Sequence, residues 1–139
     1  MAVSDIQRNN PAIDYVGHEV FAELGFTHAV SAGNTVYISG IAPLRGATVE
    51  QLEVVGAGSM PQQVSYVLRV LDESLAALEL DRTNLVSWNV FTTDMPELAR
   101  CAGIFKLWAG DHPPASMWSG VTALILPEMK LELTAIAVR

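Results

Sequence analysis

The sequence predicts a single α+β domain in which a mixed β-sheet carries two helices on one face. Along the 139 residues the patterns follow the order hairpin, helix, strand, helix, strand, strand. Each helical pattern has one apolar stripe, which is most easily buried against a sheet. The length suits one domain with its own core, and we assign residues 1–139 to it.

The first clear β pattern is a hairpin. Residues 1–25 are weakly patterned and are interpreted as an N-terminal arm that leads into the first strand. From His28, the run HAVSAGNTVYISGIAPL contains two β-rich segments separated by Gly33-Asn34, which tolerate the positive φ of a tight turn. At the end of the second segment, Ser39-Gly40 offers a ligand a close approach to the backbone, or else forms a bulge.

Two amphipathic helices follow the hairpin. The first starts at Ser59 as N-cap, with Gln62 three residues on, and has the stripe Val64, Val67, Leu68, Leu71, Leu75 and Leu78. The second starts after Asp94 and ends near Gly110, with the stripe Leu98, Cys101, Ala102 and Phe105. The run NLVSWNVFTTD between them predicts a strand.

Residues 121–138 have the pattern of two buried strands around a turn at Pro127-Glu128-Met129. Alternation in KLELTAIAV places Glu132 on the face opposite Leu131 and Leu133. We expect that face to line a cleft or to be covered by another subunit, where desolvation would raise the pKa of the carboxyl group. Alternatively, Glu132 is exposed at an edge or pairs with a lysine or arginine of a neighbour.

Composition and charge restrict the partners. Half of the residues are hydrophobic, which favours surface buried between subunits. A formal charge of -7 without a Lys/Arg cluster argues against nucleic-acid binding. The first residues lack the apolar core of a signal peptide and no apolar run is long enough to span a membrane, so we expect a soluble, cytoplasmic protein without membrane partners.

Cysteine and histidine usage predicts no metal site. Cys101 is the only cysteine, and its apolar helical context favours a buried thiol over a nucleophile. His18, His28 and His112 are scattered, and no His-x-x-x-His pair, phosphate-binding glycine loop or nucleophile elbow is present.

Taken together, these segments resemble the RidA family, also called YjgF or reactive intermediate deaminases. The matching pieces are AGNTVYISGIAP, MPQQVSYVLRVLDESLAALEL, LVSWNVFTTDMPELA and SGVTALILPEMKLELTAIAV, and they cover roughly residues 26–138 in unbroken order. The resemblance implies a chorismate-mutase-like fold, a homotrimer and small-molecule clefts at the subunit interfaces. It also implies hydrolysis of enamines and imines to ketoacid and ammonia without a cofactor.

Two of the family's cleft positions are kept and the substrate-gripping arginine is lost. Glu132 matches the glutamate that positions water, and Ser39-Gly40 match the family's Ser-Gly. Counted back from the Leu-Pro pair near the end, the arginine position holds Trp118; matched on the Pro-Ala pair before the strand, it holds Ser116. Either match leaves the carboxylate of an imino acid without its clamp.

Three other cleft positions also differ. Phe26 stands for the family's cleft tyrosine, Ala102 for the asparagine of the second helix, and Gly120 for a cysteine near the arginine. The resemblance thus implies a hydrolase for a neutral or aromatic imine or enamine, with Glu132 as general base or water-orienting group and Trp118 and Phe26 stacked on the substrate. The alternative is a non-catalytic trimer that binds a small ligand or regulates a partner; ribonuclease activity ranks last because of the acidic charge.

Overall fold

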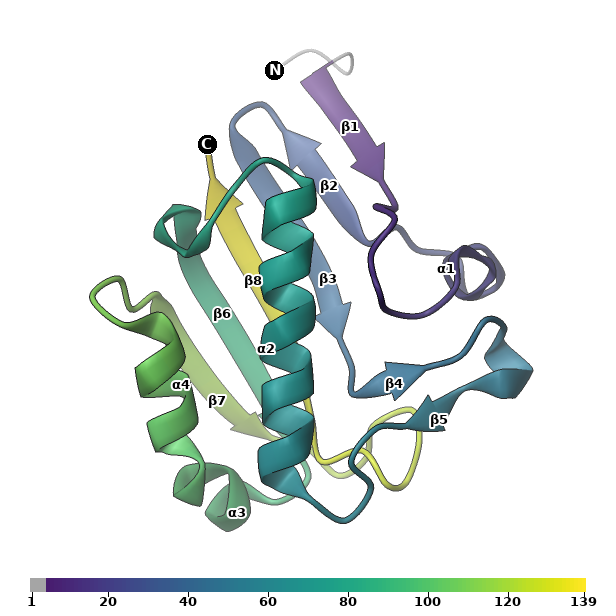
Figure 1. Ribbon diagram of the computed structural model, residues 1–139, viewed down its shortest axis with the longest axis vertical. Coiled ribbons are helices and arrows are strands. Elements are labelled where there is room, and N and C mark those ends of the chain that lie inside the picture. The colour runs from purple at the N-terminus through teal and green to yellow at the C-terminus, as the bar shows by residue number, and fades with distance from the viewer. Residues whose placement is uncertain (1–4) are drawn as a thin grey trace.

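Within residues 5–139, which the computed structural model describes, six strands form one mixed sheet and two short strands form another (Figure 1). Neighbours in the larger sheet are antiparallel except β6 and β7, which are parallel. The order across it is β1 (Ile6–Asn9), β2 (Ala29–Ala32), β3 (Thr35–Ile41), β8 (Leu131–Val138), β6 (Leu85–Thr92) and β7 (Ala115–Gly120). The predicted mixed sheet is confirmed.

The main helices cover one face of this sheet, as predicted (Figure 1). The long helix α2 (Met60–Ala77) crosses the centre, with α3 (Met95–Arg100) and α4 (Ala102–Ala109) beside it over β6 and β7. The remaining elements are α1 (His18–Leu24), the short pair β4 (Leu44–Arg45) and β5 (Glu53–Val54), and 3-10 turns η2 (Val49–Gln51) and η3 (Arg82–Asn84).

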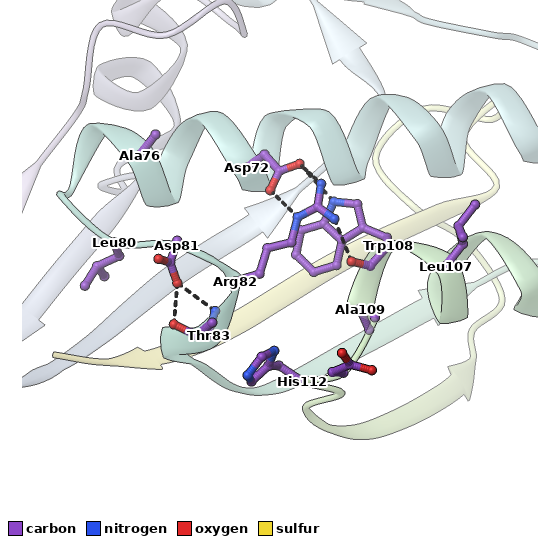
Figure 2. Close-up of a pocket in the computed structure, with 12 residues that line it drawn as sticks. Asp72, Ala76, Leu80, Asp81, Arg82, Thr83, Leu107, Trp108, Ala109 and His112 are labelled. Carbon is purple, nitrogen blue, oxygen red and sulfur yellow. Dashed lines mark hydrogen bonds and ion pairs between the residues drawn. The ribbon is translucent and has the colours of Figure 1, made fainter.

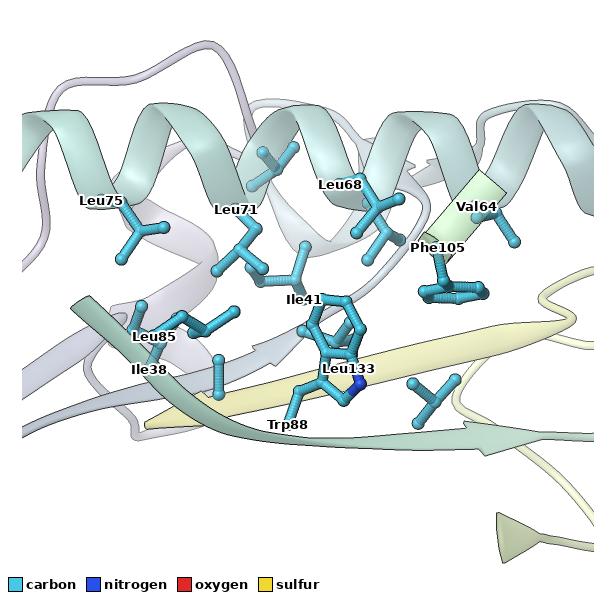
Figure 3. Close-up of a cluster of buried hydrophobic side chains, with 14 of the residues drawn as sticks. Ile38, Ile41, Val64, Leu68, Leu71, Leu75, Leu85, Trp88, Phe105 and Leu133 are labelled. Atoms are coloured by element: carbon cyan, nitrogen blue, oxygen red, sulfur yellow. The ribbon is translucent and has the colours of Figure 1, made fainter. Parts of the chain in front are cut away.

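Helix α2 carries the main core. Its N-cap is Ser59, whose hydroxyl accepts a hydrogen bond from the Gln62 backbone N–H at 3.3 Å, as the spacing predicts. The predicted apolar stripe is buried. Figure 3 shows side chains of this stripe pointing at side chains from the sheet: Val64, Leu68, Leu71 and Leu75 above Ile38, Leu85, Trp88 and Leu133.

The second predicted helix is interrupted. Its Asp94 cap is present, since the side chain accepts a hydrogen bond from the Glu97 N–H at 3.1 Å. The expectation of one continuous helix to Gly110 is wrong, because the chain turns at Cys101 between α3 and α4. There Cys101 N–H bonds to the Leu98 carbonyl three residues back, and this tight turn bends the path while keeping both side chains buried.

The predicted hairpin joins β2 and β3. Ala32 pairs with Thr35, which leaves a two-residue turn, and Gly33 has φ of 61°. This left-handed conformation is one that glycine adopts without steric cost.

Of the two strands predicted within residues 121–138, the first is not formed, so this prediction is wrong. Strand β7 ends at Gly120, and residues 121–130 form a loop before β8. The apolar residues of this loop pack into a second cluster instead of a sheet: Leu124, Leu126 and Met129 lie with Val16, Val20, Phe21, Ala42 and Leu44. An apolar run that fills such a cluster is indistinguishable in sequence from a buried strand.

The sheet face opposite the helices leaves large apolar groups exposed. Tyr37 of β3 pairs with Ile136 of β8, and Met117 of β7 pairs with Asn89 of β6. Tyr37 and Met117 are 49% and 61% exposed. Val36 and Ile38 on either side of Tyr37 are buried, as are Trp88 and Val90 on either side of Asn89, the partner of Met117. Tyr37 and Met117 therefore lie on the opposite, open face, which no helix covers in Figure 1.

Candidate functional site

Glu132 lies on β8 at the open face of the sheet. Leu131 and Leu133 on either side of it are buried under the helices, and Glu132 itself is half-buried. On the neighbouring strand β6 it pairs with Phe91. The alternation of the sequence therefore predicts its direction correctly.

Gly40 gives the Glu132 side chain its room. The β3–β8 register shifts between Ile38 and Ile41, so Ser39 and Gly40 form a bulge opposite β8. A Cβ atom on Gly40 would lie 2.5 Å from Glu132 Oε1, far inside contact distance. The bulge interpretation of the Ser39-Gly40 pair is confirmed. Within the chain, the group that approaches the Gly40 backbone closely is the Glu132 carboxylate. The approach of a ligand to this backbone stays a prediction.

The Ser39 side chain is already engaged. Its hydroxyl donates to the Thr27 carbonyl at 2.5 Å, while its backbone N–H donates to the His28 carbonyl. Ser39 therefore holds the bulge in place and leaves the neighbouring glycine facing the carboxylate.

Tyr15 brings a hydroxyl group to the same place. Its oxygen accepts the Ala42 backbone N–H at 2.9 Å, so its own hydrogen remains available as a donor. Burial, together with the charge of Glu132, raises the pKa of Tyr15 well above its ordinary value. The hydroxyl is therefore protonated at any physiological pH.

These groups share one small cavity of about 130 Å³. Apart from Tyr15 and Glu132, its lining is apolar side chains and backbone. The lining residues are Tyr15, Val16, Val20, Leu24, Phe26, Gly40, Ala42, Leu44, Leu52, Ile125 and Glu132. A mostly apolar cavity with few convergent polar groups is typical of a small-molecule site.

The Glu132 carboxyl group has no hydrogen-bond or ion-pair partner in the described part of the chain. Burial alone raises its pKa. A half-buried carboxylate without a partner is unfavourable for folding. Such a cost is common where a protein uses the group to bind or to transfer a proton.

The two aromatic residues that were expected to stack on one substrate, Phe26 and Trp118, lie in different parts of the structure. Phe26 lines the cavity and packs edge-on against Phe21, with ring centroids 5.1 Å apart. Trp118 pairs with Val90 and lies against Phe105 of α4 at 5.6 Å, so its indole is on the helix side of the sheet. Within one chain the two rings do not meet over one ligand.

Two more candidate residues lie outside this cavity. Ala102 is the exposed first residue of α4, and Gly120 is exposed at the end of β7. Of the candidate residues, a single chain thus brings together Phe26, Gly40 and Glu132.

Tyr15 is a residue of this cavity that the sequence pattern does not predict. The sequence match assigned the cleft tyrosine position to Phe26, whereas the structure places both aromatic side chains in the cavity. The segment around Tyr15 has no periodic pattern. The one local signal is an aromatic side chain with a hydroxyl group directly before Val16-Gly17, in a segment that precedes the first clear strand.

A larger hollow of about 630 Å³ lies between α2 and α4 (Figure 2). At its centre Arg82 donates to both Asp72 oxygens at 2.8 and 2.6 Å and lies over the Trp108 ring at 4.3 Å. The Trp108 indole N–H also donates to Asp72 at 3.0 Å. Because these charged groups satisfy one another, the hollow has no unpaired group at its centre that calls for a ligand.

The histidines do not assemble into a metal site. His28 is buried, its Nε2 lies 2.8 Å from Ser74 Oγ, and burial lowers its pKa to about 4. His18 and His112 are exposed. In the described part of the chain no three His, Cys, Asp or Glu side chains are grouped to hold a metal ion. Likewise, none of its helices is both long and apolar enough to cross a bilayer.

Comparison with known sequences identifies the family. The model for the family described as Endoribonuclease L-PSP matches residues 17–139. Protein DfrA of Myxococcus xanthus is 34% identical over 109 residues, which cover 78% of this chain and 79% of that protein. The mitochondrial protein MMF1 of Saccharomyces cerevisiae is 31% identical over 117 residues, covering 84% and 77%.

Solved structures share the fold. A putative endoribonuclease from Thermotoga maritima has a TM-score of 0.78 at 27% identity, covering 96% of this chain and 98% of its own. Yeast Mmf1 has a TM-score of 0.78 at 26% identity, covering 96% and 99%. A Mycobacterium tuberculosis member of the YjgF/YER057c/UK114 family has a TM-score of 0.77 at 19% identity, covering 96% and 99%.

The class of protein is therefore an α+β domain with the fold of these structures. Within that class, the chain belongs to the endoribonuclease L-PSP family, which is the YjgF/RidA family.

Proposed function

We propose that this protein is a cofactor-free hydrolase that releases ammonia from an imine or enamine metabolite, in clefts between the subunits of a homotrimer. Family membership supports the reaction class. The observation that carries the proposal is Glu132, an unpartnered carboxylate that shares a small apolar cavity with the Tyr15 hydroxyl. A carboxylate with a raised pKa is suited to accept a proton and return it.

In the proposed reaction Glu132 orients a water molecule and takes its proton as the oxygen attacks the imine carbon. Glu132 passes this proton to the imine nitrogen, which gives the carbinolamine R₂C(OH)NH₂. Glu132 then takes the hydroxyl proton of the carbinolamine and transfers it to the nitrogen as the C–N bond breaks, so that ammonia leaves and the carbonyl forms. The sum is R₂C=NH + H₂O → R₂C=O + NH₃. Tyr15 can donate a hydrogen bond to the oxygen as the new carbonyl forms. An enamine enters the same path once its β-carbon is protonated.

The usual anionic 2-imino acids are not the proposed substrates. Trp118 and Ser116, the two residues matched to the family's arginine, carry no charge. The cavity lining includes the carboxylate of Glu132 and no cation. A substrate carboxylate would therefore be repelled instead of clamped.

Exposed apolar groups on the open sheet face support the trimer. Tyr37 and Met117 are large, apolar and about half exposed or more on the face that carries Glu132. Burying this face against other copies of the chain would remove apolar surface from water and complete the walls of the cleft.

The direct test is Glu132→Gln, assayed by ammonia release from 2-iminopropionate and from a panel of neutral imines. We expect activity on neutral imines to fall by about 10²–10⁴-fold, the usual contribution of a general base. Glu128→Gln, which changes an exposed loop carboxylate, is the matched control. Unchanged activity in Glu132→Gln would remove the catalytic assignment, and family-typical activity on 2-iminopropionate would refute the altered specificity.

The same variant should remain folded. Because burial raises the pKa of Glu132, its ionised form costs stability above the folded-state pKa, and this cost disappears as the pH falls below the ordinary value of 4.5. Glu132→Gln should therefore be at least as resistant to urea as the parent protein at pH 7.5.

Two alternatives give different results. A non-catalytic binding or regulatory trimer is favoured by the loss of the arginine, and it would bind ligands without releasing ammonia from any imine. Ribonuclease activity is suggested by the Thermotoga maritima relative, which is described as a putative endoribonuclease, but the charge of -7 disfavours it. Tight, salt-dependent RNA binding would reverse that ranking.

A further inference from the structure

We propose that the cavity around Glu132 selects a small, positively charged imine with an aliphatic substituent and rejects imines that carry a carboxylate. This inference rests on the proposed function and specifies its substrate class. It concerns what the cavity binds, so it can be tested without turnover.

The apolar walls define the substituent. Six aliphatic side chains line the cavity with Glu132, from α1 and the segment that precedes it, from β4, from the residue after η2 and from the 121–130 loop: Val16, Val20, Leu24, Leu44, Leu52 and Ile125. The volume of about 130 Å³ is well below the roughly 300–1,000 Å³ of pockets for drug-sized ligands. A short branched hydrocarbon group suits this space, since it buries apolar surface without leaving a polar group unpaired.

The charge of the cavity defines the head group. Glu132 is its only ionisable acid or base apart from the neutral Tyr15 hydroxyl, and it lacks a cationic partner in the described chain. A ligand cation would supply that partner and offset the cost of burying the carboxylate. A ligand anion would add a second negative charge a few ångströms away.

The rest of the chain has few cations to alter this balance. Of the eight lysines and arginines, four already pair with carboxylates: Arg45 with Glu53, Arg69 with Glu73, Arg82 with Asp72 and Lys130 with Glu97. The other four, Arg8, Arg100, Lys106 and Arg139, do not line the cavity. Within one chain the negative charge of Glu132 is therefore the main electrostatic feature of the cavity.

The protonated imine also fits the chemistry. Its N–H groups can donate to the Glu132 carboxylate, which holds the carbon that water attacks beside the Tyr15 hydroxyl. The balanced reaction is R₂C=NH₂⁺ + H₂O → R₂C=O + NH₄⁺. No oxidant, reductant or cofactor enters it.

Three isosteric probes test the selection: isobutyramidinium, isobutyramide and isobutyrate have the same shape and differ in charge. Binding to the full-length protein is measured by isothermal titration at pH 7.5 and low salt. We expect the amidinium to bind about tenfold or more tightly than the amide, and isobutyrate to bind weakest. Isobutyrate binding as tightly as the amidinium, or no binding of any probe, would overturn the inference.

Two variants locate the effect. Glu132→Gln should abolish the preference for amidinium over amide and keep amide binding, whereas Glu128→Gln should leave all three affinities unchanged. Ile125→Arg places a cation at the cavity lining and should invert the order in favour of isobutyrate. A preference that survives Glu132→Gln would place the selecting group elsewhere and refute the assignment.

The binding and activity results separate the two proposals. Selective amidinium binding without ammonia release from any imine would reject the proposed hydrolase and retain the cavity's selectivity. Imine hydrolysis combined with preference for isobutyrate would retain the proposed hydrolase and reject the proposed selectivity of the cavity.

Discussion

A single glycine lets the Glu132 carboxylate occupy its position. The bulge at Ser39-Gly40 brings the β3 backbone against Glu132 Oε1, at a distance where no side-chain carbon fits. The sequence shows a Ser-Gly pair at a strand end and a glutamate 92 positions later. Nothing local to either segment predicts their contact, because it depends on the register between β3 and β8.

Gly40→Ala should uncouple the carboxylate from the cavity. The added methyl group collides with the far end of a flexible side chain, so Glu132 can rotate away and the stability loss should be only about 1 kcal/mol. Amidinium binding and ammonia release should fall by about tenfold or more. The control, Gly103→Ala in α4, meets nothing within 4 Å and should stabilise the protein by roughly 0.5–1 kcal/mol. Full activity in Gly40→Ala would show that the contact is unimportant.

His28 links the core to the pH dependence of stability. Its ring is 1% exposed, its Nδ1 has no hydrogen-bond partner among residues 5–139, and burial lowers its pKa to about 4. Its ring also packs against Tyr15 of the cavity, with centroids 5.6 Å apart. The folded protein therefore holds this imidazole neutral where the unfolded chain would protonate it.

Stability should fall as the pH decreases from 6.5 towards 4, since the unfolded state then binds a proton that folded His28 does not. The full loss is roughly 3 kcal/mol per chain. Urea unfolding across this pH range should show a smaller slope for His28→Gln than for the parent. His112→Gln, at an exposed position, should leave the slope unchanged. Equal slopes for parent and His28→Gln would contradict the assignment.

At the scale of elements, predictability follows the strength of the local pattern. Helix α2 has a long stripe and a cap, so its start and its buried face are predicted correctly. Strand β1 has only four residues, three of them exposed, and α1 has seven, so neither produces a periodic signal. Residues 121–130 have the apolar pattern of a strand without forming one, because their apolar side chains pack into the second hydrophobic cluster.

The α2 stripe should dominate the stability of the domain. Leu71 is fully buried between α2 and the sheet, so Leu71→Ala should cost about 2–5 kcal/mol through lost burial and a residual cavity. Leu107→Ala makes the same chemical change at a position that is 85% exposed and should cost less than about 0.5 kcal/mol. Urea denaturation measures both. Similar losses would mean that α4 and α2 contribute differently from what their burial indicates.

At the scale of the whole molecule, the proposed trimer explains the composition. Half of the residues are hydrophobic, and the open sheet face displays part of this excess as Tyr37 and Met117. A face of this kind is unusual for a monomer that stays apart in water. The cavity lies towards the same face, so assembly and ligand binding should be coupled.

Met117→Lys should weaken the assembly, because association would bury an unpaired ammonium group. Sedimentation velocity should show trimers for the parent protein and smaller species for the variant. Leu107→Lys places the same charge on an exposed leucine of α4 and should remain trimeric. A trimeric Met117→Lys protein would place the interface elsewhere, and a monomeric parent would reject the trimer itself.

The sequence by itself determined the properties that depend on neighbours along the chain. The α+β class, the Gly33-Asn34 hairpin, the cap and stripe of α2, and the direction of Glu132 all follow from periods of two or 3.6 residues and from turn chemistry. The series of such segments was enough to recognise the family.

Only the tertiary structure decided which residues form the site. Tyr15, Gly40 and Glu132 come from distant segments and meet through the β3–β8 register, the bulge and the packing of the segment that precedes α1. The parallel pairing of β6 and β7 likewise turns Trp118 toward α4 and away from this cavity. Local patterns report which side of an element is buried, whereas the identity of its neighbour depends on contacts between segments far apart in the chain.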